Sequence, residues 1–211
     1  MVLAGIKVAD TPLVRDALDL ARSSLEPYLF NHVMRSWLFG ILLSEGIDPA
    51  PDPELLAVSA VLHDLGLTDR YTAEDRFEVD GANAACAFLK DRGISTQQAQ
   101  VVWDAIALHT TPSIALHKEP EVAMTYSGIA VDVIGVGLDR IPQDKQRAVL
   151  TEFPRLAFKN QFKECLCSVS VIRKKRATSF DNVIRDFGIR YVEGFTAPSF
   201  ADLFANAAFS E

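Results

Sequence analysis

Apolar residues recur at helical spacing along most of the chain, and residues that favour helix ends separate the runs. Thr11-Pro12 is a typical N-cap followed by a first helical position, so the first helix is expected to begin there. Pro27 opens a second helix, which Gly46 ends. Further helices are predicted at 54–65, 80–89, 97–109, 121–138, 144–153, 158–173, 180–187 and 199–207. Because strand-like alternation is weak, the pattern predicts an all-α fold.

Two connecting segments stand out between these helices. Pro49, Pro51 and Pro53 make a stiff connector before helix 54–65, and Gly66 is the expected C-cap of that helix. The polar stretch 67–80 is long for a loop in a compact domain, which is typical of the rim of a pocket.

Length and composition narrow the class of protein. A chain of 211 residues with 49% hydrophobic content favours a single domain over 1–211 with a substantial core. The net charge is −7, and the one basic cluster is Arg173-Lys174-Lys175-Arg176. Nucleic acid is therefore disfavoured as a partner, because phosphate contacts normally need a basic face.

The sequence predicts a cytoplasmic protein. Residues 1–7 lack the charged and long apolar regions of a signal peptide, and Asp132 interrupts the most apolar stretch, so no run reaches the roughly 20 residues that span a bilayer. Cys86, Cys165 and Cys167 do not have the spacing of a zinc clasp or a redox pair.

Candidate chemistry is concentrated at His63-Asp64, which ends an otherwise apolar helical run. A buried carboxylate is costly without a compensating partner, and imidazole is the commonest nitrogen ligand of divalent metals. The pair thus indicates a metal site, although a helix-capping His beside a turn Asp gives the same dipeptide. Asp132 is likewise the single charge inside helix 121–138, so we expect it either to bind a metal or to pair with Arg140 or Arg35.

The chain has only four histidines: His32, His63, His109 and His117. If His32, His63, Asp64 and Asp132 converge, they form a shell of two nitrogens and two oxygens. Such a shell suits one divalent ion, with Zn as the first choice and Fe, Mn, Ni or Co as alternatives, and it is too rich in nitrogen for Ca.

The order His…His-Asp…Asp on helices resembles the HD-domain superfamily of metal-dependent hydrolases, and several longer segments resemble its cyanamide hydratase branch. The segments that carry this resemblance are Asn31-His32-Val33-Met34-Arg35, Leu62-His63-Asp64-Leu65-Gly66-Leu67-Thr68-Asp69, Arg76-Phe77-Glu78-Val79-Asp80-Gly81-Ala82, Ala105-Ile106-Ala107-Leu108-His109-Thr110 and Glu152-Phe153-Pro154-Arg155. The resemblance implies a compact helical bundle around a metal site. Its core would span about 28–140, with an N-terminal helix and a C-terminal helical extension.

The resemblance also implies roles for individual residues. The metal ligands would be His32, His63, Asp64 and Asp132. Asp64 would also orient the activated water, and His109 would transfer a proton, unless His109 only caps its helix. We expect the substrate pocket to involve Asp69, Phe77, Glu78, Trp103 and His117, with an aromatic wall near Phe162.

Four functions remain open at this point. The first hypothesis is hydration of a small nitrile such as cyanamide by a water that the metal activates. The second is hydrolysis of a nucleotide or phosphomonoester. That reading is weakened by Leu67, which stands where phosphohydrolases of the superfamily commonly carry an acid, although Asp69 could substitute if the turn folds back. Arg35, Arg76 and Lys118 would have to hold the phosphate.

The third hypothesis is a non-catalytic module that binds a metabolite. The fourth is a dinuclear iron oxygenase, which would need both His109 and His117 as ligands although they are close in sequence. In each case the expected partner is a small molecule, with neither nucleic acid nor a membrane, and a homo-oligomer is compatible with the sequence.

Overall fold

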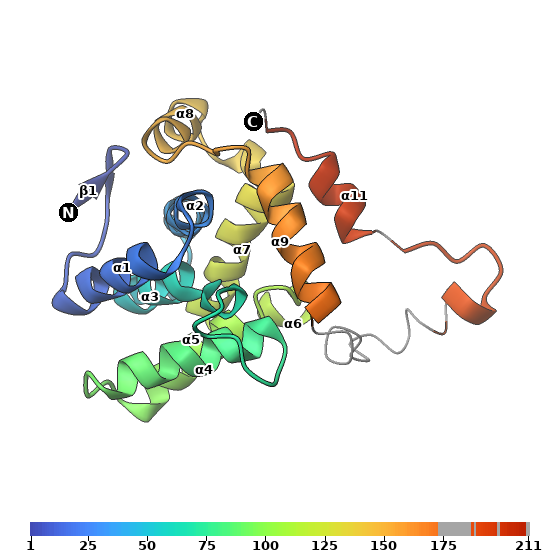
Figure 1. Ribbon diagram of the computed structural model, residues 1–211. Helices are drawn as coiled ribbons and strands as arrows, with labels where there is room; N and C mark the ends of the chain where they lie inside the picture. Colours follow the sequence, from blue (N-terminus) through green and yellow to red (C-terminus); the bar gives the residue numbers. More distant parts are fainter. Residues whose placement is uncertain (173–186, 188, 198, 210–211) are drawn as a thin grey trace.

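The computed structural model describes residues 1–172, 187, 189–197 and 199–209, and in this part of the chain helices dominate (Figure 1). A small antiparallel hairpin, β1 (Val2–Leu3) with β2 (Ile6–Lys7), precedes them. The α-helices are α1 (Pro12–Ser24), α2 (Pro27–Ser44), α3 (Pro53–Leu62), α4 (Phe77–Lys90), α5 (Thr96–Ala107), α6 (Pro112–Ala115), α7 (Pro120–Ile134), α8 (Gln143–Glu152), α9 (Phe158–Ile172) and α11 (Phe200–Ala205). Two 3-10 turns, η1 (Leu65–Leu67) and η2 (Leu138–Arg140), complete the order. The predicted all-α fold is confirmed.

Local capping explains several helix starts. Thr11 accepts a hydrogen bond from the Val14 amide at α1, and Asp52 accepts from the Glu54 and Leu55 amides at α3. Ser95 and Ser199 cap α5 and α11 in the same way. Each of these side chains satisfies an amide that the first helical turn leaves without a partner. The helix predicted at 180–187 lies almost wholly outside the described residues.

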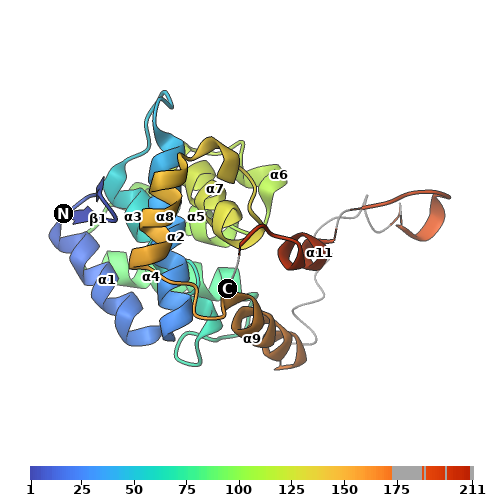
Figure 2. The ribbon, with the colours of Figure 1, turned by 90° about the horizontal axis from the view of Figure 1, so that it is seen from above.

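Helix α2 lies at the centre of the bundle, between α1 and α3 on one side and α7 on the other (Figures 1 and 2). Trp37, Leu38 and Phe39 on this helix are fully buried. Its N-terminal half also carries buried polar residues, among them His32 and Arg35. A central helix that buries charged side chains has to find partners for them on its neighbours.

Helices α2 and α7 approach each other closely because two glycines face one another. A Cβ atom added to Gly128 would lie 2.1 Å from the Ser36 carbonyl oxygen and 2.6 Å from the Gly40 amide nitrogen. Asp132 follows Gly128 by one turn of α7, and His32 precedes Ser36 by one turn of α2. The close crossing therefore brings His32 and Asp132 together although they are distant in sequence.

A second close approach corrects the predicted end of α3. The helix ends at Leu62, His63 is its C-cap, and η1 follows, so Gly66 does not cap the helix. Gly66 instead packs against α4, where an added Cβ would lie 1.9 Å from the Phe77 carbonyl oxygen. Helix α4 also begins at Phe77, one turn earlier than predicted. This contact places His63-Asp64 beside the start of α4.

The C-terminal part of the chain covers one side of the bundle. Helix α9 packs against α2, and α11 packs against α7 (Figures 1 and 2). Aromatic contacts join the two, since the Phe204 ring lies 6.2 Å from that of Phe158 and 5.8 Å from that of Phe162. These contacts hold α11 against α9.

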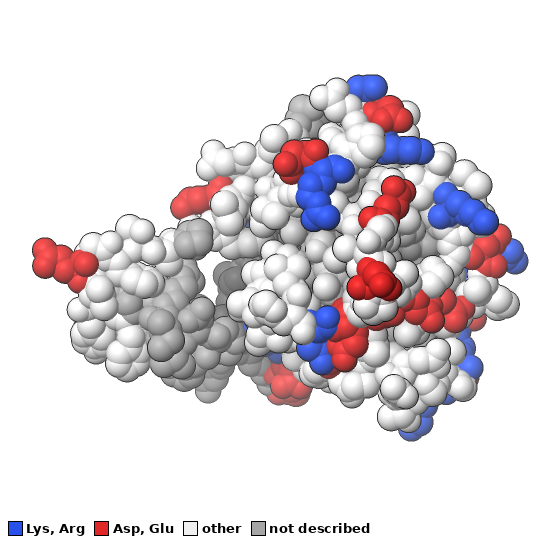
Figure 3. Space-filling view, turned by 180° about the vertical axis from the view of Figure 1, so that it is seen from behind, with Lys and Arg blue, Asp and Glu red and all other residues white. Residues whose placement is uncertain are grey.

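The face opposite to that of Figure 1 carries acidic and basic side chains interspersed with one another (Figure 3). Among the described residues, no helix combines the length and the apolar character needed to cross a bilayer.

Candidate metal centre

Three side chains that are candidates for metal ligation meet between α2 and the end of α3. The Nε2 atoms of His32 and His63 are 3.2 Å apart, and Oδ2 of Asp64 lies 3.6 Å and 3.3 Å from them respectively. All three side chains are at most 1% exposed. Two ligand atoms bound to one ion at about 2.1 Å lie about 3.0–3.4 Å from each other. Two of the observed distances lie within this range and the third, 3.6 Å, is slightly longer, so the three atoms are close to the spacing of ligands of a single ion.

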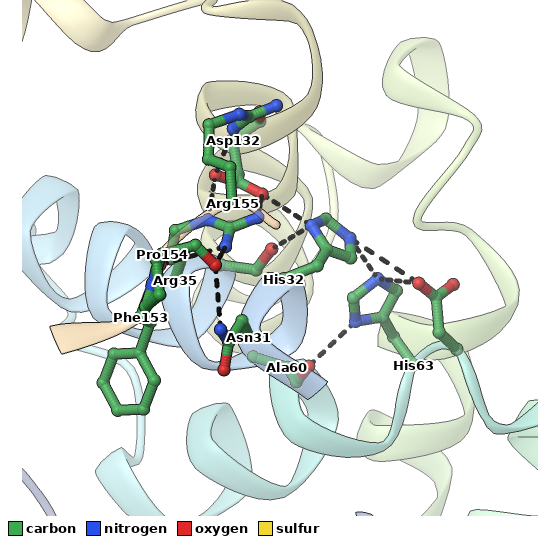
Figure 4. A network of polar contacts seen from close by, with 11 residues as sticks. Asn31, His32, Arg35, Ala60, His63, Asp132, Phe153, Pro154 and Arg155 are labelled. Atoms are coloured by element: carbon green, nitrogen blue, oxygen red, sulfur yellow. Dashed lines mark hydrogen bonds and ion pairs between the residues drawn. The ribbon is translucent and has the colours of Figure 1, made fainter. Parts of the chain in front are cut away.

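Hydrogen bonds fix the orientation of both imidazoles. Nδ1 of His32 donates to Oδ2 of Asp132 at 2.7 Å, and Nδ1 of His63 donates to the Ala60 carbonyl at 2.8 Å (Figure 4). Because Nδ1 carries the hydrogen in each neutral ring, the two Nε2 lone pairs face each other. Such an arrangement needs positive charge between the two nitrogens. In the metal-free site, burial lowers the pKa of His63, but the carboxylate of Asp64 and the hydrogen bond to the Ala60 carbonyl, acting with other neighbouring groups, raise it above its ordinary value.

Asp64 supplies the negative ligand. Burial raises its pKa, but the charges of His63 and His32 lower it to about 2, so the carboxylate is ionised at neutral pH. Oδ2 is buried and makes no hydrogen bond with the described residues. A buried carboxylate oxygen without a hydrogen bond is costly, and a cation at this point would compensate it. Two imidazole nitrogens and one carboxylate suit Zn and the neighbouring transition ions.

Asp132 lies behind His32 rather than within this cluster (Figure 4). Its Oδ1 accepts from Arg35 Nε at 2.7 Å and from Arg155 Nη1 at 3.1 Å, while Oδ2 accepts from Arg35 Nη2 at 2.8 Å and from His32. A carboxylate offers about four acceptor positions, and these contacts use all of them. To bind an ion directly, Asp132 would have to release one of these partners. Here it orients His32 and pairs with Arg35, and its predicted role as a ligand stays a prediction.

His109 stands next to the cluster. Its Nδ1 donates to the Ile106 carbonyl at 2.6 Å, and its Nε2 lies 3.9 Å from Oδ1 of Asp64. Burial, followed by the charge of His63, lowers its pKa to about 4, so the ring is neutral at physiological pH. A neutral imidazole with an available Nε2 lone pair can accept a proton. The position of His109 beside Asp64 is compatible with proton transfer, and that role stays a prediction.

Glu78 is held at the same end of the site. Its Oε1 accepts from Arg76 Nη2 at 2.5 Å and from Thr110 Oγ1 at 2.6 Å. Burial raises the pKa of Glu78, but Arg76, Thr110 and other neighbouring groups together lower it below its ordinary value, so the carboxylate is ionised. The Arg76 guanidinium is therefore engaged by Glu78.

A cavity of about 970 Å³ opens from this cluster. His32, His63, Asp64, Glu78 and His109 lie at one end of it, and Phe77 also lines it. The rest of the lining is mainly apolar and comes from α7, α9 and the segment around α11.

Three residues predicted to contact substrate lie elsewhere. Asp69 and His117 are exposed, and Trp103 donates to Asn83 Oδ1 at 2.9 Å; none of them lines the cavity. Asp69 follows η1 as an exposed residue outside the cavity lining, so it does not take the place of the acid that Leu67 replaces. Their positions do not support the predicted substrate contacts. The exposed His117 also removes the second set of ligands that a dinuclear centre would require.

Other residues at the site were not foreseen. The Phe158 ring stacks on His32 with a centroid distance of 4.8 Å. Arg155 forms an ion pair with Asp132, in addition to the pair that Arg35 makes with the same carboxylate. Arg155 belongs to segment 152–155, one of those that carry the family resemblance, which is the signal that could have identified it. The cavity walls from α11 had no comparable signal.

The comparison with protein families agrees with this geometry. The family model described as HD domain matches residues 29–144, which is more than half of the chain and includes every residue of the metal cluster. No curated protein matches the sequence.

Proposed function

This chain belongs to the HD domain family, whose members are generally metal-dependent hydrolases, and from that premise we propose that it adds water to a small, uncharged substrate. The observation that carries the proposal is the meeting of His32, His63 and Asp64 at the polar end of a cavity, with the neutral His109 beside them. Such a site joins a metal-binding group to a proton acceptor.

In this proposal, different side chains hold the metal ion, orient a ligand and transfer a proton. A divalent ion supplies Lewis acidity and lowers the pKa of water towards about 7. Asp64 and the two imidazoles hold the ion, and Asp132 keeps His32 in the required orientation. Nε2 of His109 and Oδ1 of Asp64 are close enough to contact one water together, so His109 can take its proton.

The charges of the cavity favour an uncharged substrate over a phosphate ester. Among the described residues that line the cavity, Arg76 is the one Lys or Arg, and it is paired with Glu78. The other two candidates for phosphate binding are also engaged, Arg35 by Asp132 and Lys118 by Asp104.

We therefore propose nitrile hydration as the reaction, with cyanamide as its simplest substrate. Water adds across the carbon–nitrogen triple bond: its oxygen bonds to carbon, one proton moves to nitrogen, and tautomerisation gives an amide, or urea from cyanamide. His109 would accept the proton from water and return it to the nitrogen. Phosphomonoester hydrolysis is the second candidate, and it requires Arg76 to turn from Glu78 towards the substrate.

The test is a substrate panel with the metal-loaded protein. The panel contains cyanamide, simple nitriles, nucleoside monophosphates and a generic phosphoester. The expected result is urea or amide formation that His109→Gln slows and that His117→Ala, a control for loss of an exposed imidazole, leaves unchanged. Phosphate release without amide formation would establish the second candidate, and a bound metal with no turnover would indicate a non-catalytic binding module.

A further inference from the structure

We propose that the substrate carries an extended, uncharged apolar group, which binds between α7, α9 and α11 while the reactive group lies at the metal cluster. The placement of the reactive group at the metal cluster rests on the proposed function. The apolar binding site is inferred from the lining and volume of the cavity alone.

The cavity is far larger than a nitrile such as cyanamide requires. Its volume of about 970 Å³ equals that of roughly thirty waters at about 30 Å³ each. Pockets for drug-sized ligands span about 300–1,000 Å³, so this one lies at the upper end of that range. A substrate that fills it needs a substantial body beyond its reactive group.

The lining separates a polar end from an apolar chamber. Three helices supply most of the apolar side chains: Ile129, Ala130, Val133 and Ile134 on α7, Phe162 and Leu166 on α9, and Phe200 and Leu203 on α11. On each helix these residues recur at helical spacing, so one face of each helix is turned to the cavity. A molecule with one polar group and an apolar body matches this division.

The α11 side of the chamber leaves apolar surface in contact with water. Phe200 and Leu203 are 52% and 44% exposed although both line the cavity. Their neighbour Phe204 is buried against Phe158 and Phe162, so α11 is anchored while Phe200 and Leu203 face the chamber. An apolar ligand would cover these side chains and gain the free energy of their burial.

The side chains that α7, α9 and α11 contribute to the chamber carry no charge. A charged group within the body of a ligand would lose its hydration there without gaining a partner, whereas a bound divalent ion at the polar end offsets the carboxylates of Asp64 and Glu78. The chamber therefore fits an uncharged, apolar body.

The test measures binding rather than turnover, using the full, metal-loaded chain and three probes: acetonitrile, hexanenitrile and octanenitrile. Burial of each methylene is expected to tighten binding about fourfold, as measured by calorimetry.

A matched pair of variants locates the binding site. Leu203→Asp is expected to weaken octanenitrile binding at least tenfold and to leave acetonitrile unaffected. Leu116→Asp is the control, because Leu116 is 50% exposed and does not line the cavity. Thermal unfolding and metal content check that both variants fold, and Phe200→Ser replaces Leu203→Asp if that variant does not.

The outcomes keep the two proposals apart. Affinity for the nitriles that does not rise with chain length, or an unchanged affinity for octanenitrile in the Leu203 variant, would overturn the inference. Turnover of cyanamide in that case would leave the proposed function standing. Chain-length-dependent binding without hydration of any nitrile would support the chamber and reject the proposed reaction.

Discussion

Replacing Asp132 with asparagine tests whether this residue pairs with buried cations or binds the metal. Asparagine keeps the size of the side chain and removes its charge. In the structure the carboxylate accepts from Arg35, Arg155 and His32. Arg35 is fully buried and Arg155 is 5% exposed. The variant thus leaves two buried guanidinium groups facing a neutral amide.

The expected loss of stability follows from this geometry. Breaking a buried ion pair by removing one partner costs about 3–5 kcal/mol. For a protein of this length, each kcal/mol lowers the melting temperature by about 2–4 °C. Asp132→Asn should therefore lower the melting temperature of the metal-free protein by about 6–20 °C. The matched control is Asp104→Asn, which breaks the partly exposed pair with Lys118 and should cost less than about 1 kcal/mol.

The assay is urea unfolding with a chelator present, followed by metal titration of the folded variant. If Asp132 orients His32 from behind, metal affinity should fall about 10–100-fold. A metal-free variant within about 1 kcal/mol of the unmodified protein would refute the buried pairing. A stable variant that has lost metal binding almost completely would show that Asp132 is a ligand, as the family resemblance implies.

Three other changes probe separate parts of the structure. His109→Gln should retain the metal and lower turnover about 10²–10⁴-fold, because it removes the proton acceptor beside Asp64; equal turnover in the two proteins would exclude that role. Gly128→Ala should destabilise the protein by about 3 kcal/mol or more, since the added methyl group overlaps the Ser36 carbonyl oxygen, and the neighbouring Ser127→Ala should cost far less in the same urea titration. The pKa of Glu78 lies below its ordinary 4.5, so its contribution to stability is present above about pH 4.5 and is lost as the pH falls through the lowered pKa. Urea titrations between pH 7 and pH 3 should show a smaller acid-induced loss in Glu78→Gln, and an identical loss would contradict the contacts that lower this pKa.

Helix starts and the metal cluster could be predicted from the sequence because their signals are local. Thr11, Asp52 and Ser95 sit directly before helical runs, and each accepts the capping hydrogen bond typical of such residues. His63-Asp64 was recognisable because charged residues are rare inside an apolar run. Its meeting with His32 needed the family resemblance, since nothing local to either segment indicates their contact.

Features that depend on packing between distant segments could not be predicted. Gly66 has the sequence appearance of a helix cap, but its missing side chain instead serves the contact with Phe77. Asp132 was expected either to bind a metal or to pair with a cationic side chain. Because α2 and α7 cross closely, it accepts hydrogen bonds from both His32 and Arg35, which the sequence alone does not indicate. The sequence also does not show that Trp103, an aromatic residue at helical spacing, lies outside the cavity. Nor does it show that residues of α11 line the cavity.

The most direct test of the central claim is metal binding by the chelator-treated protein, measured by calorimetric titration with Zn²⁺ and by elemental analysis. The unmodified protein should bind one ion per chain, His63→Ala and Asp64→Ala should lose it, and His117→Ala, which removes an exposed imidazole, should bind as the unmodified protein does. Full metal occupancy in both His63→Ala and Asp64→Ala would contradict the assignment of this cluster as the metal centre.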